Sequence, residues 1–125
     1  MKVLTIKEPW ATLIIKGYKK YEFRSWKTKY RGKILIHAGL SIDKNNVSKF
    51  NNYNLEYSQG QIIGEAKLVD CILVDESLQK ELQEKNLLVY GNNNVGKYAW
   101  KLENVVKYDK KEKIKGKLGL WNYDK

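Results

Sequence analysis

Residues 17–26 constrain the fold of this chain more than any other segment. An apolar run with helical spacing precedes them, and Gly17 is a residue type that commonly ends a helix. Residues 20–24 then alternate polar and aromatic side chains, which is the pattern of a half-buried strand. The chain is therefore predicted to turn directly from a helix into a strand, with Tyr21 and Phe23 facing a core.

The other face of this strand carries Lys20, Glu22 and Arg24, and the preceding helix is expected to cover it. Lys19 lies at the corner between helix and strand. We predict a small cleft lined by Lys19, Glu22 and Arg24. Two other interpretations stay open. The charges form a solvated strand face with an ion pair worth at most about 1 kcal/mol, or Glu22 and Arg24 are a buried structural pair that holds the helix in place.

The length of 125 residues predicts a single domain over residues 1–125. One cysteine, Cys71, excludes an internal disulfide and a cysteine-based zinc site, and His37 is the only histidine. We therefore expect no metal and no cofactor, and read His37 as a strand residue. The chain starts without a signal-peptide pattern and has no apolar run of membrane-spanning length, which predicts a cytoplasmic protein with no membrane partner.

The net charge of +10 is unevenly distributed. Residues 16–33 hold eight basic side chains against one acid, giving +7, and residues 97–125 hold nine against four, giving +5. Residues 34–96 carry five against eight, giving −3. Such a field favours a polyanion such as nucleic acid as the partner. The alternative is a merely soluble, lysine-rich protein.

Hydrophobic periodicity predicts strands at residues 3–6, 33–38, 61–74 and 97–103, the last continuing through 105–108. It predicts helices at 9–16 and 76–85, the second capped by Asp75, and a weak helix after Asp43. Residues 39–42 are expected to break a strand, 51–60 to form a loop and 110–117 a basic connector. Short strands without regular βαβ alternation predict an α+β fold, a small, mostly antiparallel β-barrel with two or three helices.

The segment Gly17-x-Lys19-x-x-Glu22-x-Arg24 resembles the G-x-K-x-x-E-x-R signature of the ASCH domain, within the PUA-like superfamily. Flanking segments also look family-like, and the resemblance covers nearly the whole chain. They are residues 6–11, where Glu8 stands in place of the usual glutamine, and residues 24–26, 30–37, 98–102 and 116–121.

The resemblance implies a PUA-like barrel, with a cleft between barrel and helix that holds the signature residues. It implies nucleic-acid binding, mostly of RNA. It also implies a second class of activity, because some small ASCH proteins hydrolyse N4-acetylcytidine with a lysine, a threonine and a glutamate, and others look like ribonucleases. The lysine corresponds to Lys19 and the glutamate to Glu65, but the threonine position holds Glu22, which cannot simply replace a hydroxyl nucleophile.

Two sets of site residues follow. Catalytic residues, if present, are Lys19, Glu22 and Glu65, although Glu65 is equally read as a plain outward strand residue. For nucleic acid, Lys27, Lys29 and Arg31 are expected to hold phosphates, and Trp26 or Tyr30 to stack on a base. The full predicted binding set is Trp10, Arg24, Ser25, Trp26, Lys27, Thr28, Lys29, Tyr30 and Arg31. The choice among RNA, DNA and a modified nucleoside, the oligomeric state, and whether residues 51–60 cover the cleft stay open.

Overall fold

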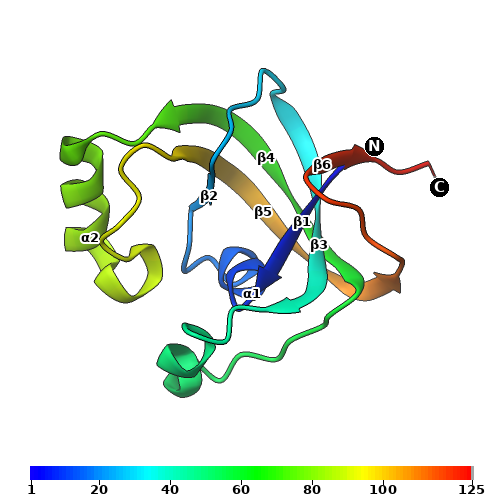
Figure 1. The fold of residues 1–125 in the computed structure, drawn as a ribbon. Coiled ribbons are helices and arrows are strands. Elements are labelled where there is room, and N and C mark those ends of the chain that lie inside the picture. Colours follow the sequence, from blue (N-terminus) through cyan, green and yellow to red (C-terminus); the bar gives the residue numbers. More distant parts are fainter. Residues whose placement is uncertain (125) are drawn as a thin grey trace.

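The computed structural model describes residues 1–124 and contains six strands, two α-helices and one 3₁₀ helix (Figure 1). The elements in chain order are β1 (Lys2–Glu8), α1 (Trp10–Ile15), β2 (Tyr21–Arg24), β3 (Gly32–Ile42), η1 (Val47–Tyr53), β4 (Gln61–Leu73), α2 (Glu76–Tyr90), β5 (Tyr98–Lys113) and β6 (Leu120–Asn122).

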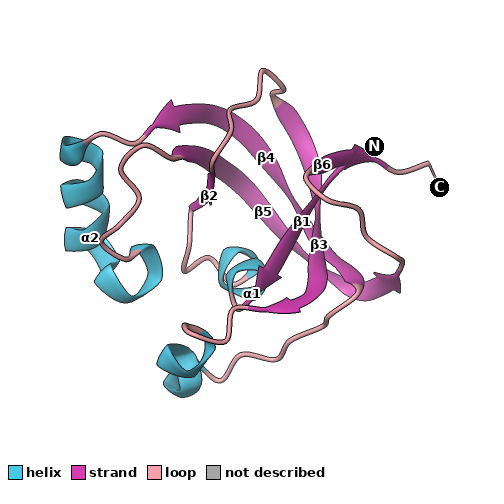
Figure 2. Cartoon of the chain, viewed as in Figure 1, coloured by secondary structure: helices cyan, strands magenta, loops and turns pink. Residues whose placement is uncertain are grey.

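All six strands belong to one curved sheet in the order β2-β5-β4-β3-β1-β6 (Figure 2). Only β1 and β3 pair in parallel, and the other neighbours are antiparallel. The predicted α+β class and mostly antiparallel sheet are confirmed. Within residues 1–124, however, β2 and β6 are edge strands that do not pair with each other, so the sheet is not closed into a barrel.

The main core lies between α1 and the sheet. Ala11, Ile14 and Ile15 of α1 pack with alternating residues of β1, β3, β4 and β5, and Trp100 is fully buried among them. Gly64 of β4 makes this packing possible. A Cβ at Gly64 would clash with the carbonyl oxygen of Val106 and lie 2.6 Å from Ile15 Cδ1. The absence of a side chain therefore allows β5 and α1 to approach β4 closely.

A second cluster packs α2 and η1 around the other side of α1. Its buried members are Leu13, Phe50, Leu82, Val89 and Tyr90. The predicted cap of α2 is confirmed, because Asp75 Oδ1 accepts a hydrogen bond from the Leu78 amide at 2.8 Å. The helix is interrupted by non-helical dihedral angles at Asn86 and then continues to Tyr90. Residues 87–90 thereby become part of a helix instead of a loop, against the predicted end near residue 85.

Two further predicted boundaries were wrong. Residues 39–42 do not break a strand, since β3 continues to Ile42, and Gly39 lies where a Cβ would be 3.1 Å from Thr5 Cγ2 of the neighbouring strand. The predicted basic connector begins late, because β5 extends to Lys113 and pairs with β4 as far as Gln61. In the described part of the chain, no helix is long and apolar enough to cross a membrane.

Candidate functional site

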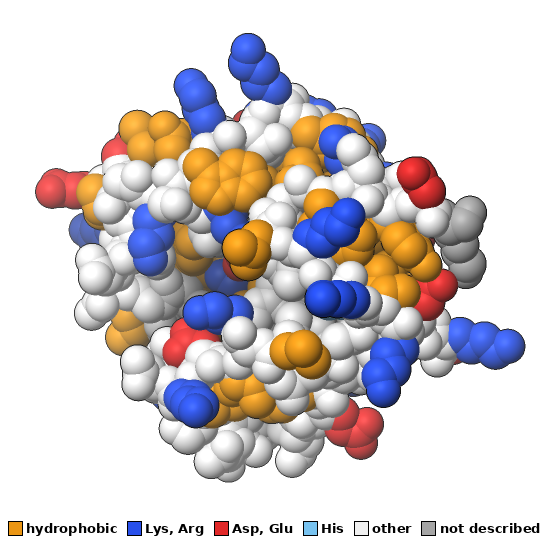
Figure 3. All heavy atoms as spheres, turned by 45° about the vertical axis from the view of Figure 1, so that its right-hand side comes forward, with side chains coloured by type: hydrophobic (Ala, Val, Ile, Leu, Met, Phe, Trp, Pro, Cys, Tyr) orange, Lys and Arg blue, Asp and Glu red, His pale blue; other side chains and the backbone are white. Residues whose placement is uncertain are grey.

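A cleft of about 1560 Å³ opens where the sheet is not closed. Its walls come from β1, β2, the end of β3, residues 87–97 after the kink in α2, and residues 113–119 between β5 and β6. The space-filling view shows a hollow with basic side chains around it and a basic side chain inside it (Figure 3). The predicted cleft residues Lys19, Glu22 and Arg24 all line it, together with Trp10.

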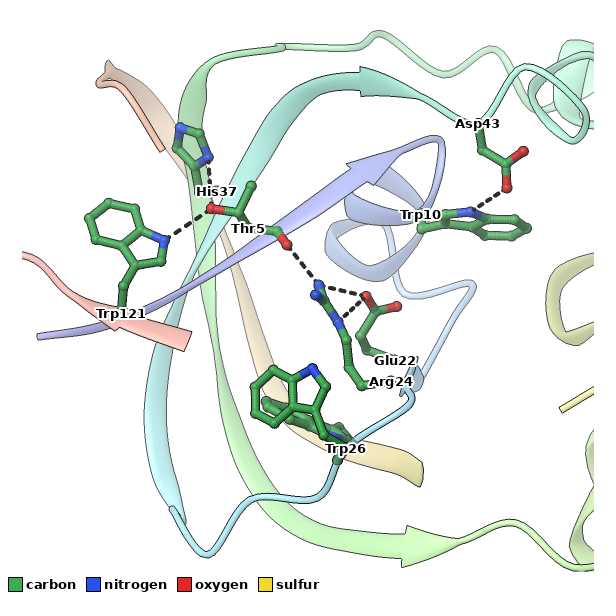
Figure 4. Close-up of polar contacts among 9 residues, drawn as sticks. Thr5, Trp10, Glu22, Arg24, Trp26, His37, Asp43 and Trp121 are labelled. Carbon is green, nitrogen blue, oxygen red and sulfur yellow. Dashed lines mark hydrogen bonds and ion pairs between the residues drawn. The ribbon is translucent and has the colours of Figure 1, made fainter. Parts of the chain in front are cut away.

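Arg24 is held in place by two partners, Glu22 and Thr5 (Figure 4). Its Nε donates to Glu22 Oε2 at 3.1 Å, and its Nη2 lies 3.0 Å from the same oxygen and donates to the Thr5 carbonyl at 2.7 Å. Both side chains are mostly shielded, with 20% of Arg24 and 9% of Glu22 exposed. Nη1 of Arg24 has no hydrogen-bond partner among residues 1–124. The guanidinium of Arg24 is therefore fixed in the cleft lining, and the protein leaves the donor capacity of Nη1 unused.

Lys19 is buried, with 3% of the residue exposed. Its ammonium group is surrounded by aromatic rings, 4.4 Å from the Phe23 centroid, 5.2 Å from Trp10 and 5.7 Å from Tyr90. Burial lowers the pKa of Lys19 to about 8, although the nearby Glu22 carboxylate acts in the opposite direction. Lys19 is thus a cation in an aromatic box that loses its proton more readily than an ordinary lysine.

Trp10 is fixed at the opposite side of this box. Its indole N–H donates to Asp43 Oδ2 at 3.1 Å, and its ring packs edge-on against Phe50. Burial alone would raise the pKa of Asp43, but hydrogen bonds from Asn46, Trp10 and backbone amides outweigh burial and lower it. Asp43 is therefore an ionised anchor, and Trp10 belongs both to the core and to the cleft.

The cleft is strongly basic. Among the described residues, its lining includes eight basic residues and two acids, Glu22 and Asp43. Six of the basic side chains are exposed on the rim, where they are free to meet solvent or a ligand. These rim lysines are Lys7, Lys49, Lys97, Lys113, Lys115 and Lys117.

The basic loop predicted to hold phosphates lies outside this cleft. Residues 25–31 connect β2 to β3, and none of them lines the cleft. The loop is bonded internally, because Arg31 donates to the carbonyls of Thr28 and Tyr30, and the Tyr30 hydroxyl donates to the Lys33 carbonyl. Ser25, Lys27 and Lys29 are exposed. Trp26 is 39% exposed and packs edge-on against Trp100, near Gly119 at the end of the cleft wall.

Glu65 is not brought together with Lys19. It is absent from the cleft lining, and its carboxylate accepts from the Tyr108 hydroxyl at 2.8 Å and lies 3.4 Å from Lys33 Nζ. Its hydrogen bond contributes, after burial, to raising the pKa of Tyr108 to about 12. The carboxylate that the structure does place beside Lys19 is Glu22, which is engaged by Arg24.

Residues 113–119 form a cleft wall, whereas the sequence predicted a basic connector over residues 110–117. His37 fixes this wall, since its Nε2 lies 2.9 Å from the Ile114 carbonyl and its Nδ1 lies 3.3 Å from Thr5 Oγ1. Gly116 allows the close approach, because a Cβ there would lie 2.6 Å from His37 Nδ1. The signal available in the sequence was the excess of +5 after residue 96. Among residues 1–124, no group of three or more His, Cys, Asp or Glu side chains is arranged to hold a metal ion.

Comparison with known proteins gives a consistent result. A family model described as the ASCH domain matches residues 4–115. The chain is similar to Activating signal cointegrator 1 of Mus musculus, at 29% identity over 97% of this chain, and of Homo sapiens, at 31% over 66%. It spans only 22% and 15% of the lengths of those two relatives.

Solved structures resemble the fold. A crystal structure of ASCH from Zymomonas mobilis superposes with a TM-score of 0.57 at 17% identity, covering 90% of this chain and 72% of that chain. A crystal structure of a mutant of the same Zymomonas mobilis protein gives a TM-score of 0.52 at 18% identity, covering 85% and 70%. At this identity the likeness concerns the fold.

Proposed function

The chain belongs to the ASCH domain family, and we propose that it is a nucleic-acid-binding domain whose cleft takes a base or nucleotide of an RNA strand. One observation carries the proposal. The cleft combines an exposed lysine rim with a lining that contains the Arg24–Glu22 ion pair and the rings of Trp10, Phe23 and Tyr90. Lysines on a rim neutralise phosphates, whereas fixed polar groups and aromatic faces suit an unstacked base.

The roles of the residues follow from their positions. Lys115 and Lys117 on the wall contact the phosphate backbone. The free Nη1 of Arg24 donates to an acceptor on the base edge or to a phosphate oxygen. Trp10 is available at the floor to pack against the base. Residues 27–31 contribute a second, more distant basic surface.

Salt-dependent titration tests this assignment. The probes are a labelled ten-nucleotide RNA, the matching DNA and free cytidine. The variant Lys115→Ala/Lys117→Ala is compared with Lys27→Ala/Lys29→Ala, which removes the same charge from the loop. The rim variant is expected to lower the slope of log affinity against log salt by about 1.4, because each lost phosphate contact on a single strand removes about 0.7. If only the loop variant showed a lower salt dependence of RNA binding, the placement of the RNA strand in the cleft would be contradicted.

A second candidate function rests on the lowered pKa of Lys19 in an enclosed site. We propose it as the alternative: hydrolysis of a modified nucleoside such as N4-acetylcytidine, in which neutral Lys19 accepts a proton from water as the water attacks the acetyl carbonyl. The bond between the acetyl carbon and N4 then breaks as protonated Lys19 gives the proton to N4, and the products are acetate and cytidine. Arg24 would stabilise the negative charge that develops on the carbonyl oxygen.

The hydrolase function is tested by the pH dependence of the reaction and by variants of Lys19. Release of acetate from N4-acetylcytidine is expected to rise with pH and level off above about pH 8, where Lys19 is neutral. Lys19→Ala abolishes the activity, and Lys20→Ala, on an exposed neighbour, retains it. Equal background rates in wild type and Lys19→Ala would remove the hydrolase function and leave the binding function intact.

A further inference from the structure

A second cavity, of about 220 Å³, opens beside the C-terminal end of α1. It lies between Lys16, residues 54–58 and β5, and none of its lining residues lines the cleft. Three lysines from distant parts of the chain meet here. They are Lys16 after α1 and Lys107 and Lys111 of β5.

Two carboxylates act on these lysines at longer range, Glu56 on Lys16 and Glu8 on Lys111. None of the three lysines forms an ion pair with a carboxylate within 4.0 Å in the described part of the chain. Lys111 Nζ donates to Ser58 Oγ at 2.7 Å, a neutral partner. Glu56 also lines the cavity but is exposed, and the buried Glu8 behind it is engaged by the amide and hydroxyl of Thr12.

Lys16 and Lys107 line the same cavity. The neighbouring Lys107 is the main cause that lowers the pKa of Lys16 below its ordinary value. Two adjacent ammonium groups repel each other, and a multivalent anion between them replaces repulsion with attraction. The cavity also offers the Ser58 hydroxyl and the Asn54 side chain as neutral polar groups.

We propose that this cavity is a second anion site, which binds a phosphate group between the ammonium groups of Lys16, Lys107 and Lys111, with the hydroxyl of Ser58. Lysine ammonium groups are compact donors that bind phosphate oxygens as point charges. The phosphate is either a free one or a phosphodiester of a strand that also contacts the protein elsewhere. The site is distinct from the cleft and does not depend on the function proposed for the cleft.

The test compares Lys16→Gln/Lys107→Gln with Lys80→Gln/Lys85→Gln. The control removes the same charge from exposed positions of α2 that line neither cavity. Inorganic phosphate is titrated by ³¹P NMR, and a ten-nucleotide RNA by fluorescence anisotropy. Thermal unfolding of both variants checks that the fold is retained.

The cavity variant is expected to weaken the binding of at least one probe about tenfold relative to the control, as for the loss of a charge-assisted hydrogen bond. An effect on inorganic phosphate alone identifies a small phosphate compound as the ligand. An effect that includes the RNA identifies a backbone phosphate. Equal affinities of the cavity and control variants for both probes would overturn the proposal.

Discussion

Arg24 of β2 donates a hydrogen bond of 2.7 Å to the main-chain carbonyl of Thr5 in β1. This contact crosses the opening between two strands that do not pair with each other. Along the paired strands, main-chain amides satisfy such carbonyls, but here a side chain does so. Arg24 therefore pairs with Glu22 and also lines the cleft. The cleft and the buried structural pair, which the sequence offered as separate interpretations, involve the same two residues.

Replacing Arg24 tests its structural part. Arg24→Gln is expected to lower the free energy of unfolding by about 2–3 kcal/mol, because the mostly buried Glu22 carboxylate loses its partner and Thr5 loses a donor. Chemical denaturation measures the change.

The matched control is the double variant Glu22→Gln/Arg24→Gln. It removes the uncompensated carboxylate, so it should be more stable than Arg24→Gln alone. If the double variant lowered the free energy of unfolding by the sum of the changes in Glu22→Gln and Arg24→Gln, the two side chains would not be coupled.

Lys19 makes the stability of the protein depend on pH in a specific direction. The unfolded chain keeps the Lys19 proton up to its ordinary pKa of 10.5, whereas the folded protein releases it at about 8. Between these values the unfolded state binds more protons, so stability rises with pH. Below about pH 8, the folded protein carries the full free-energy cost of burying the charged Lys19 ammonium group.

Lys19→Met is accordingly expected to raise the free energy of unfolding at pH 7 by about 3 kcal/mol and to remove the rise between pH 8 and 10.5. Denaturation at pH 7 and pH 10 measures both effects, with Lys20→Met as the exposed control. If Lys19→Met and wild type share the same pH dependence, Lys19 is not the buried cation described here.

Gly64 is predicted to be more sensitive than glycines in left-handed turns. Gly64→Ala should lower the free energy of unfolding by about 3 kcal/mol or more, because its Cβ overlaps the Val106 carbonyl and crowds Ile15. Gly96→Ala, at φ +91 with open space around it, should cost only about 1 kcal/mol. Thermal unfolding ranks the two, and the reverse order would contradict the packing of β5 on β4.

The local pattern of residues 17–26 was sufficient to predict the cleft floor. Lys19, Glu22 and Arg24 are close in sequence, and strand alternation after Gly17 places Glu22 and Arg24 on one face. Strand alternation predicted that Phe23 faces only the core. Phe23 does pack against the second hydrophobic cluster, but it also lines the cleft beside Lys19. Because β2 is covered on both sides, neither of its faces is fully exposed to solvent.

The rest of the cleft depends on long-range topology, which a single sequence does not specify. Residues 113–119 reach the cleft because β6 pairs with β1 and because His37 binds the Ile114 carbonyl. The basic loop of residues 25–31 is adjacent to the signature in sequence but leads away from it in space, toward β3. Glu65 lies on β4 opposite Leu35 and Val106, with Tyr108 as its partner. Sequence proximity therefore linked the loop to the cleft, which it does not line, and gave no indication that Lys113, Lys115 and Lys117 line it.

The four tryptophans make the most direct test of the cleft as the binding site. Trp10 lines the cleft, Trp26 lies on the loop side, and Trp100 and Trp121 are buried. Each indole N–H gives one signal in a ¹H–¹⁵N NMR spectrum, and Trp→Phe variants assign them. On saturation with a ten-nucleotide RNA, the Trp10 signal is expected to move most, because its indole N–H bonds Asp43 at the cleft floor. A Trp10 signal that stays in place while that of Trp26 moves would show that the basic loop, and not the cleft, binds the strand.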